Sequence, residues 1–194
     1  MTDSRRDEPV RLTRIYTRTG DGGETSLGDG TRTKKTDPII AAIGSLDELG
    51  AAVGLALVAD MPERLRSPLE RIQNELFDLG ADLSVPLAEG SRERLRIGKD
   101  SVESLERLCD QLNAGLEPLR SFVLPGGGEA ATRLHLSRAI CRRAEREVLV
   151  AADEHALNPL VAVYLNRLSD LLFIFARVAA ADDGERLWRP GVSD

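Results

Sequence analysis

Five stretches of the chain repeat apolar residues at the spacing of an α-helix, and this pattern limits the possible folds more than any other feature. The first stretch follows Asp37 and Pro38, which suit the N-cap and the first turn of a helix. We therefore predict that a helix begins at Pro38. Its apolar positions recur three and four residues apart, as on one helix face: Ile39, Ala42, Ile43, Leu46, Leu49, Val53, Ala56 and Leu57.

The other four stretches carry the same periodicity, and the chain has little strand signal. Long amphipathic helices joined by modest loops predict an all-α protein, a five-helix bundle behind an N-terminal segment rich in glycine and threonine. We expect one domain over residues 11–190, with short tails at residues 1–10 and 191–194. The remaining helices are expected over these approximate ranges: Pro62 to Leu83, Lys99 to Gly115, Ala130 to Ala152 and Pro159 to Ala181.

The composition favours a folded chain, with 42% hydrophobic and 30% charged residues. Its net charge of -6 argues against general nucleic-acid binding, because proteins with that task are more often basic. We find no apolar run of the roughly 18 residues that a membrane span needs, and no signal or transit peptide. We expect a cytoplasmic protein.

Several common catalytic and metal sites are missing from the sequence. His135 and His155 are the only histidines, and neither follows a glutamate by three residues, as a di-iron bundle would require. Cys109 and Cys141 have no metal-type spacing and give no disulfide framework. No Ser-His-Asp signature stands out. Nothing therefore suggests nucleophilic catalysis by a side chain.

Three glycines, Gly44, Gly50 and Gly54, lie inside the first predicted helix. Each costs about 1 kcal/mol of helix propensity relative to alanine. They either allow close packing against another helix or leave room for a ligand, and packing is the simpler interpretation.

The stretch "YTRTGDGGETSLGDGTRTKKTD", residues 16–37, has a composition typical of anion binding. Glycines let backbone N–H groups turn toward an anion, and hydroxyls and basic side chains add donors. Lys34 and Lys35 precede a predicted helix start, where the helix dipole also favours negative charge. The segment does not match the P-loop pattern, and surface loops of this composition are common. Phosphate binding is therefore one interpretation and a plain surface loop is the other.

The fourth predicted helix contains an arginine-rich run, "LHLSRAICRRAEREV". Arg138, Arg142 and Glu145 share one face of this helix, and Arg143 and Arg146 lie beside that face. A solvated charged face with Arg–Glu pairs and a binding site are both open interpretations.

The fifth predicted helix places four residues on one face of an otherwise apolar sequence, three of them polar or charged: Asn166, Asp170, Phe173 and Arg177. Polar groups in such a helix must find partners or face a cavity. The structural interpretation pairs Asp170 with an arginine of the fourth helix, and a binding site is compatible with it.

The stretch "SFVLPGGG" places Phe122, Val123 and Leu124 before a glycine triplet. It is either a loop that precedes a helix or an apolar wall beside a planar ligand.

Six blocks of the chain, in this order, resemble the ATP:corrinoid adenosyltransferases of the PduO type: "YTRTGDGGETSLG", "GSLDELGAAVG", "IQNELFDLGADL", "FVLPGGG", "SRAICRRAERE" and "LNRLSDLLFIFAR". The resemblance covers about Arg11 to Pro190. It implies a homotrimer of five-helix bundles with active sites between subunits. The implied reaction transfers the 5′-deoxyadenosyl group of ATP to the Co(I) of a reduced corrinoid, giving adenosylcobalamin and triphosphate. Mg²⁺ accompanies the ATP, and its protein ligands stay unassigned.

The resemblance also implies roles for individual residues. The ATP phosphates would be held by Thr17, Arg18, Gly20, Gly23, Lys34 and Lys35. The rest of the nucleotide site would be lined by Arg138, Arg142, Glu145 and Asn166. Asp47 would pair with Arg138 across the subunit interface. Phe122 would close off the lower face of the corrinoid, and the same wall would be extended by Val123, Leu124 and Phe173. A corrinoid reductase and a B12-dependent acceptor enzyme are the implied protein partners.

Two other functions use the same residues. One is a carrier of ATP or corrinoid without turnover, and the other is a structural oligomer whose arginines form interface ion pairs. Phe122 beside the full set of arginines favours the enzyme. Gly50 stands where the family often has asparagine, so no polar contact is assigned to that position.

Overall fold

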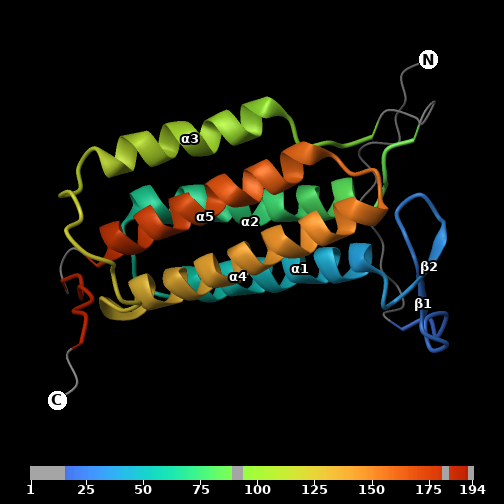
Figure 1. Cartoon of the computed structure of the whole chain (residues 1–194), viewed down its shortest axis with the longest axis horizontal. Coiled ribbons are helices and arrows are strands. Elements are labelled where there is room, and N and C mark those ends of the chain that lie inside the picture. The colour runs from blue at the N-terminus through green and yellow to red at the C-terminus, as the bar shows by residue number, and fades with distance from the viewer. Residues whose placement is uncertain (1–15, 89–93, 181–183, 192–194) are drawn as a thin grey trace.

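The computed structural model describes residues 16–88, 94–180 and 184–191, so most of the two expected tails lies outside it. The described residues form five helices, as predicted (Figure 1). Their bounds are α1 (Pro38–Leu57), α2 (Glu63–Leu83), α3 (Lys99–Asn113), α4 (Gly128–Glu154) and α5 (Pro159–Ala179).

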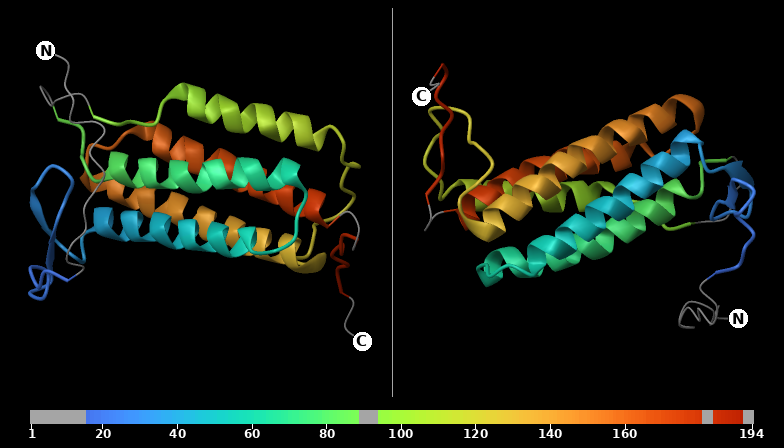
Figure 2. Two further views of the ribbon diagram at one scale, coloured as in Figure 1. Left: turned by 180° about the vertical axis from the view of Figure 1, so that it is seen from behind. Right: turned by 90° about the horizontal axis from the view of Figure 1, so that it is seen from below.

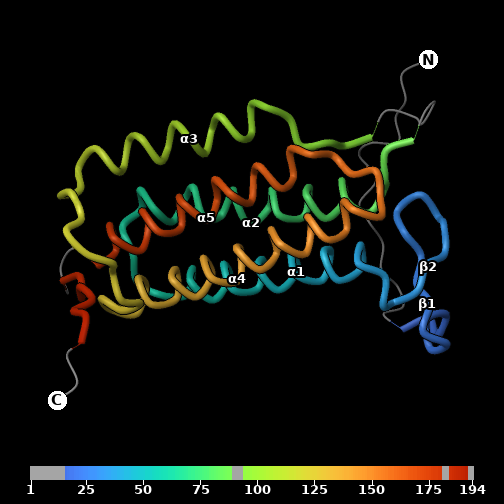
Figure 3. The backbone as a smooth tube through the Cα atoms, viewed as in Figure 1, coloured from blue at the N-terminus to red at the C-terminus, as the bar shows by residue number. Residues whose placement is uncertain are grey.

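The helices run lengthwise beside one another, and α4 packs between α1 and α5 (Figures 1 and 2). α2 packs against α1, while α3 packs against the outer side of α5. The backbone trace places the N-terminal segment at one end of the bundle and the C-terminal segment at the other (Figure 3). Aliphatic side chains fill the centre, including the fully buried Leu49, Leu69, Leu105, Leu134 and Leu168.

Two of the helices start at a side-chain cap, and both start where the sequence predicts a helix. The Asp37 carboxylate accepts a hydrogen bond from the Ile39 amide at 2.9 Å, which fixes the start of α1. Asn158 caps α5 in the same way, because its side-chain oxygen accepts from the Leu160 amide at 3.1 Å. A proline follows each cap, at the position that needs no amide donor.

α4 begins at Gly128, two residues before its predicted start at Ala130. The N-cap is Gly127, at a φ of 88°. A Cβ at this position would lie 2.6 Å from the Cβ of Ala180, so a side chain would clash with the end of α5. Gly127 therefore lets α4 start in close contact with α5, and Gly127 and Gly128 belong to the helix start rather than only to a loop.

A short antiparallel hairpin, β1 (Glu24–Ser26) with β2 (Arg32–Lys34), lies in the N-terminal segment, where the sequence analysis expected no strand. Strands of three residues are too short to show the alternation that identifies a strand in a sequence. The turn of the hairpin is joined to the bundle by the Gly28 amide, which donates to the Ser84 carbonyl at 2.8 Å.

Two helices, α1 and α5, are long and apolar enough to cross a membrane by length and composition alone. The sequence analysis found no such run. Half of each apolar window is buried inside the bundle, as in the core helices of globular proteins, and α1 exposes Asp47 and Glu48. The apolar character is therefore weak evidence for a membrane span.

A buried carboxylate, Asp82, ties the end of α2 to the start of α5. It is 1% exposed. It accepts hydrogen bonds from the Arg96 guanidinium at 2.6 Å, the Ile97 amide at 2.8 Å and the Asn158 amide nitrogen at 2.7 Å. The Asp82 carboxylate thus holds both the segment before α3 and the N-cap residue of α5.

We predict that Asp82→Ala lowers the free energy of unfolding by about 3 kcal/mol, because it leaves buried donors and a partly buried guanidinium without their partner. Urea denaturation measures the change. The control is Glu103→Ala, which removes the acid of an exposed ion pair with Arg107. It should cost less than about 1 kcal/mol. Equal losses in the two variants would contradict the prediction.

Candidate functional site

The predicted site residues fall into three groups at different positions along the length of the bundle. The hairpin segment lies where α1 begins and α4 ends (Figure 1). Arg138, Arg142, Glu145 and Asn166 lie along the middle parts of α4 and α5. Phe122 precedes α4, at the opposite end. The 27 residues of α4 span about 40 Å at the usual rise per residue, so one chain does not bring the two ends together.

The start of the N-terminal segment is exposed and has unusual backbone geometry. Arg18 is the one described non-glycine residue with a positive φ, 61°, and its guanidinium lies over the Tyr16 ring at 5.6 Å. Gly23 has a φ of 85°. The hydroxyls of Thr17 and Thr19 are hydrogen-bonded at 2.9 Å. Left-handed residues often occur in loops that bind ligands, so this geometry is compatible with the predicted anion site.

The two lysines of the segment are exposed beside the hairpin. The Lys35 side chain packs over Gly20, where a Cβ would lie 3.1 Å from its Nζ. Lys34 borders a hollow of about 530 Å³ beside the start of α1 and the end of α4. The lining of this hollow also includes Thr33, Asp37 and Glu154. The hydrogen bond from Thr33 is the main cause that holds the pKa of the Asp37 carboxyl below its usual value.

The polar stripe of α4 and α5 is partly connected. The Asn166 amide nitrogen donates to the Glu145 carboxylate at 3.0 Å, and the Asn166 oxygen accepts from Arg167 at 2.7 Å. Arg142 is exposed, and within the described ranges its guanidinium has no ion-pair or hydrogen-bond partner. The structure thus brings Glu145 and Asn166 together and leaves a free cation beside them.

Arg138 and Phe173 also meet on this stripe. The Arg138 guanidinium lies 5.3 Å from the centre of the Phe173 ring. The His135 ring lies on the same phenylalanine at 6.1 Å, and burial, followed by the Arg138 charge, lowers its pKa. No ring contact joins Phe173 to Phe122 in the described part of the chain. The two phenylalanines predicted for one wall therefore sit in separate contacts.

Asp47 and Arg138 are not paired inside the described chain. Asp47 is exposed on α1, and the ion pair that joins α1 to α4 is formed by Glu48 and Arg143. The alternative pairing of Asp170 with an arginine of α4 is also not formed among the described residues, where Asp170 is exposed.

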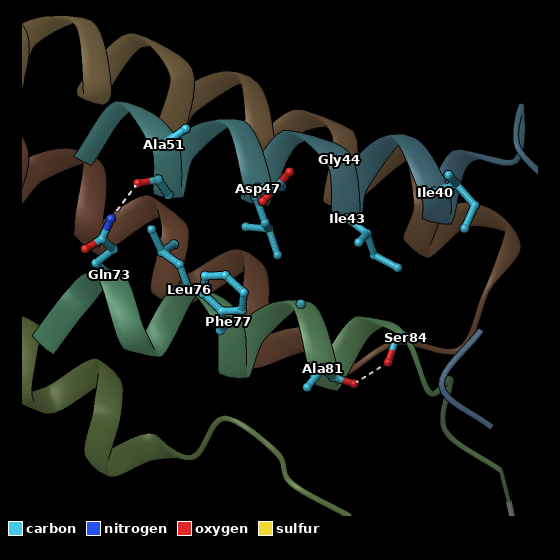
Figure 4. Close-up of a pocket in the computed structure, with 13 residues that line it drawn as sticks. Ile40, Ile43, Gly44, Asp47, Ala51, Gln73, Leu76, Phe77, Ala81 and Ser84 are labelled. Carbon is cyan, nitrogen blue, oxygen red and sulfur yellow. Dashed lines mark hydrogen bonds between the residues drawn. The ribbon is translucent and has the colours of Figure 1, made fainter. Parts of the chain in front are cut away.

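Asp47 lines an open groove of about 770 Å³ between α1 and α2 (Figure 4). Phe77 of α2 lies on its opposite side and is 73% exposed. Gly44 and Gly50 line the groove with no atom close to where a Cβ would be, whereas a Cβ at Gly54 would lie 2.8 Å from Gln73. The packing interpretation is therefore right for Gly54, while the other two glycines keep the groove open.

Phe122 lies at the far end of the bundle, and it is 75% exposed. Its ring packs against Trp188 at 5.9 Å. The backbones of the two segments pair, since the Trp188 amide donates to the Phe122 carbonyl and the Leu124 amide to the Arg186 carbonyl, both at 2.8 Å. Val123 pairs with Leu187 between them. An exposed apolar surface with two aromatic rings results.

Trp188 is a residue that the sequence analysis left without a role. The available signal was the single tryptophan of a chain with only 4% aromatic residues. Arg177, predicted on the polar face of α5, is instead buried and holds this end in place. It donates to the Glu185 carboxylate at 2.6 Å and to the Glu117 carbonyl at 2.8 Å.

Comparisons with known proteins identify the family to which this chain is similar. Residues 15–179 match the family described as Cobalamin adenosyltransferase. The chain is 51% identical over 186 residues to the corrinoid adenosyltransferase of Mycobacterium tuberculosis, covering 94% of this chain and 96% of that one. It is 47% identical over 189 residues to that of Mycobacterium leprae, covering 94% and 98%.

Comparison with a solved structure shows that the fold is also similar to that of this family. A variant of the PduO-type ATP:corrinoid adenosyltransferase from Lactobacillus reuteri, complexed with cobalamin and ATP, superposes with a TM-score of 0.84 at 35% identity. The match covers 91% of this chain and 99% of that one. The matched family spans all five helices and the hairpin, so the chain belongs to the cobalamin adenosyltransferase family, in the group of PduO-type corrinoid adenosyltransferases.

Proposed function

We propose that this corrinoid adenosyltransferase transfers the 5′-deoxyadenosyl group of ATP to the Co(I) of a reduced corrinoid, with release of triphosphate, at sites between the subunits of a homotrimer. The reaction rests on family membership over residues 15–179. The location of the sites rests on one observation: the hairpin lies where α4 ends, whereas the segment of Phe122 precedes the start of α4, at the opposite end of the bundle.

Two neighbouring chains can bring together groups that lie far apart within one chain. A neighbouring subunit that lies alongside α4 and α5 can place its hairpin against the polar stripe of the first. The groove between α1 and α2 offers an apolar surface for such a neighbour, with Phe77 exposed in it and Asp47 free of an ion pair within the described residues. In this arrangement Asp47 would meet Arg138 of the next subunit.

The nucleophile is the cobalt of the substrate, so the protein needs no activated serine or cysteine. Its work is to place the C5′ atom of ATP in line with the cobalt and to stabilise the leaving triphosphate. Arg142, Lys34 and Lys35 supply exposed positive charge for that purpose. Glu145 and Asn166 hold each other in place and orient polar atoms toward the nucleotide.

Mg²⁺ would accompany the ATP. Among the described residues no group of three or more His, Cys, Asp or Glu side chains is arranged to hold a metal ion. These residues fit an ion held mainly by phosphate oxygens and water, which is how Mg²⁺ is usually bound with nucleotides. It would neutralise charge on the phosphates when bound.

The aromatic surface at the other end suits the corrinoid face. Phe122 and Trp188 present two exposed rings to a flat macrocycle, and Val123 and Leu124 extend the apolar area. An apolar wall below the ring would exclude the lower axial ligand of cob(II)alamin and make its reduction to Co(I) easier, because axial ligation controls the potential of the metal.

A cytoplasmic location, a corrinoid reductase and a B12-dependent acceptor enzyme complete the proposal. The decisive experiment mixes the protein with ATP and chemically reduced cobalamin and follows the absorption spectrum. Conversion to adenosylcobalamin supports the enzyme. A carrier would bind both molecules without that conversion, and this result would overturn the proposal.

Arg142→Ala should raise the KM for ATP or lower kcat by one to two orders of magnitude, because a charge-assisted hydrogen bond to phosphate contributes about 1.5–3 kcal/mol. The same spectral assay measures it. The control is Arg146→Ala, one turn along α4, whose guanidinium bonds to the Arg142 carbonyl at 2.8 Å. Unchanged kinetics in a folded Arg142→Ala variant would remove this residue from the site.

Asp47→Ala and Arg138→Ala should each weaken the trimer and reduce activity, since each leaves a partly buried charge unpaired at the interface. Analytical ultracentrifugation measures assembly. Asp47→Arg combined with Arg138→Asp should recover part of the trimer. Glu48→Ala is the matched control, because Glu48 pairs with Arg143 of its own chain. Normal trimers in both single variants would show that the pair is unimportant.

Phe122→Ala should melt near the wild-type temperature, because its side chain is 75% exposed. Starting from cob(II)alamin and a reductant, turnover should fall strongly, as the axial ligand is no longer excluded. Starting from Co(I), the loss should be much smaller. The ratio of the two rates is the measurement, and equal losses from both oxidation states would leave Phe122 as ordinary packing.

A further inference from the structure

The hairpin that carries Lys34 is joined to the bundle through a carboxylate with three partners. Asp37 Oδ2 accepts from the Thr33 hydroxyl of β2 at 2.6 Å. Oδ1 accepts from the Ile39 amide of α1 at 2.9 Å and lies 2.8 Å from Nε2 of His155, the residue that follows α4. One side chain thus connects the hairpin, the start of α1 and the end of α4.

These contacts exceed what the helix start needs. An N-cap satisfies the first turn with one side-chain oxygen, and serine, threonine or asparagine serves as well as aspartate. Here the second oxygen of Asp37 holds Thr33, and His155 shares the first. The added bonds lead to the hairpin and to the end of α4, and they stabilise no further turn of α1.

His155 is well placed to fix this carboxylate. Its backbone amide donates to the Ala151 carbonyl at 2.9 Å, which seats it on the last turn of α4. The His155 and Asp37 side chains are only 22% and 18% exposed. Because a carboxylate oxygen accepts, Nε2 must carry the proton, so the contact exists with a neutral or a charged imidazole.

Lys34 follows Thr33 directly and borders the same hollow as Asp37. A shift of β2 would therefore move Lys34, and with it Lys35, relative to the bundle. Fixing a binding loop before the ligand arrives reduces the ordering cost of binding.

We propose that Asp37 and His155 are positioning residues for ATP: through Thr33 they hold the hairpin so that Lys34 and Lys35 are in place for the phosphates. This proposal rests on the proposed function of the hairpin. It assigns the two residues an effect on nucleotide affinity and none on the cobalt chemistry.

The test compares His155→Ala with His155→Gln, because the glutamine amide keeps a donor near the position of Nε2. His155→Ala should raise the KM for ATP about tenfold, the equivalent of one lost hydrogen bond to a charged group. Its kcat at saturating ATP and its KM for cobalamin should stay near wild type. His155→Gln should restore most of the affinity. Thr33→Val breaks the same link from the hairpin side and should reproduce the effect without altering either helix end.

Arg66→Ala is the structural control. Its guanidinium holds the Leu57 and Ala59 carbonyls at 2.8 and 3.0 Å, at the opposite end of α1. It should lower the melting temperature without changing the KM for ATP. If Arg66→Ala and His155→Ala raise this KM equally, the effect is general loss of stability and the proposal is overturned.

Two further measurements separate this proposal from the proposed function. If Lys34→Ala raises the KM for ATP and neither His155→Ala nor Thr33→Val does, the positioning role is wrong and the proposed function stands. If the wild-type protein forms no adenosylcobalamin, the proposed function is wrong. Titration calorimetry with ATP then decides the positioning role, and an unchanged Kd in His155→Ala and Thr33→Val overturns it.

Discussion

The packing of α4 between α1 and α5 is the constraint on which the rest of the structure depends. Small residues on its buried faces let both neighbours approach closely: Ala130, Ala131, Ser137, Cys141, Ala144 and Ala151. Because two sides of α4 are covered, only a narrow stripe remains for charged groups. The arginines of the fourth helix therefore stand where a ligand or another subunit can reach them, and Gly127 allows the helix to start against α5 without a clash.

The helices could be predicted from the sequence because apolar spacing and caps act locally. Pro38 and Pro159 mark helix starts that the structure confirms. Helical spacing alone also predicts which face of its helix carries Glu145 and which carries Asn166, and the two side chains meet in the structure. The hairpin was missed, since its strands are held by backbone bonds that any side chain permits. The contact of His155 with Asp37 joins residues 118 apart in sequence, and no local pattern announces such a distance.

Site residues were harder to interpret where one sequence feature serves two purposes. Arg177 shares a helical face with Asn166, yet it is buried and holds the C-terminal segment. Arg143 and Arg138 are five residues apart, but one pairs with Glu48 of its own chain and the other lies over Phe173. Spacing identifies which residues can share a face of α4. It does not say which of them a neighbouring element has already neutralised, because that depends on tertiary contacts.

The pairing of Trp188 with Phe122 has an optical consequence. The chain contains one tryptophan, so its ultraviolet emission arises almost entirely from the end of the bundle where that ring is half-exposed. Light emitted there responds to whatever displaces water from the two rings, and it is insensitive to events around the hairpin about 40 Å away. The molecule therefore carries a local reporter of the Phe122 end, which can be followed in solution without attaching a dye.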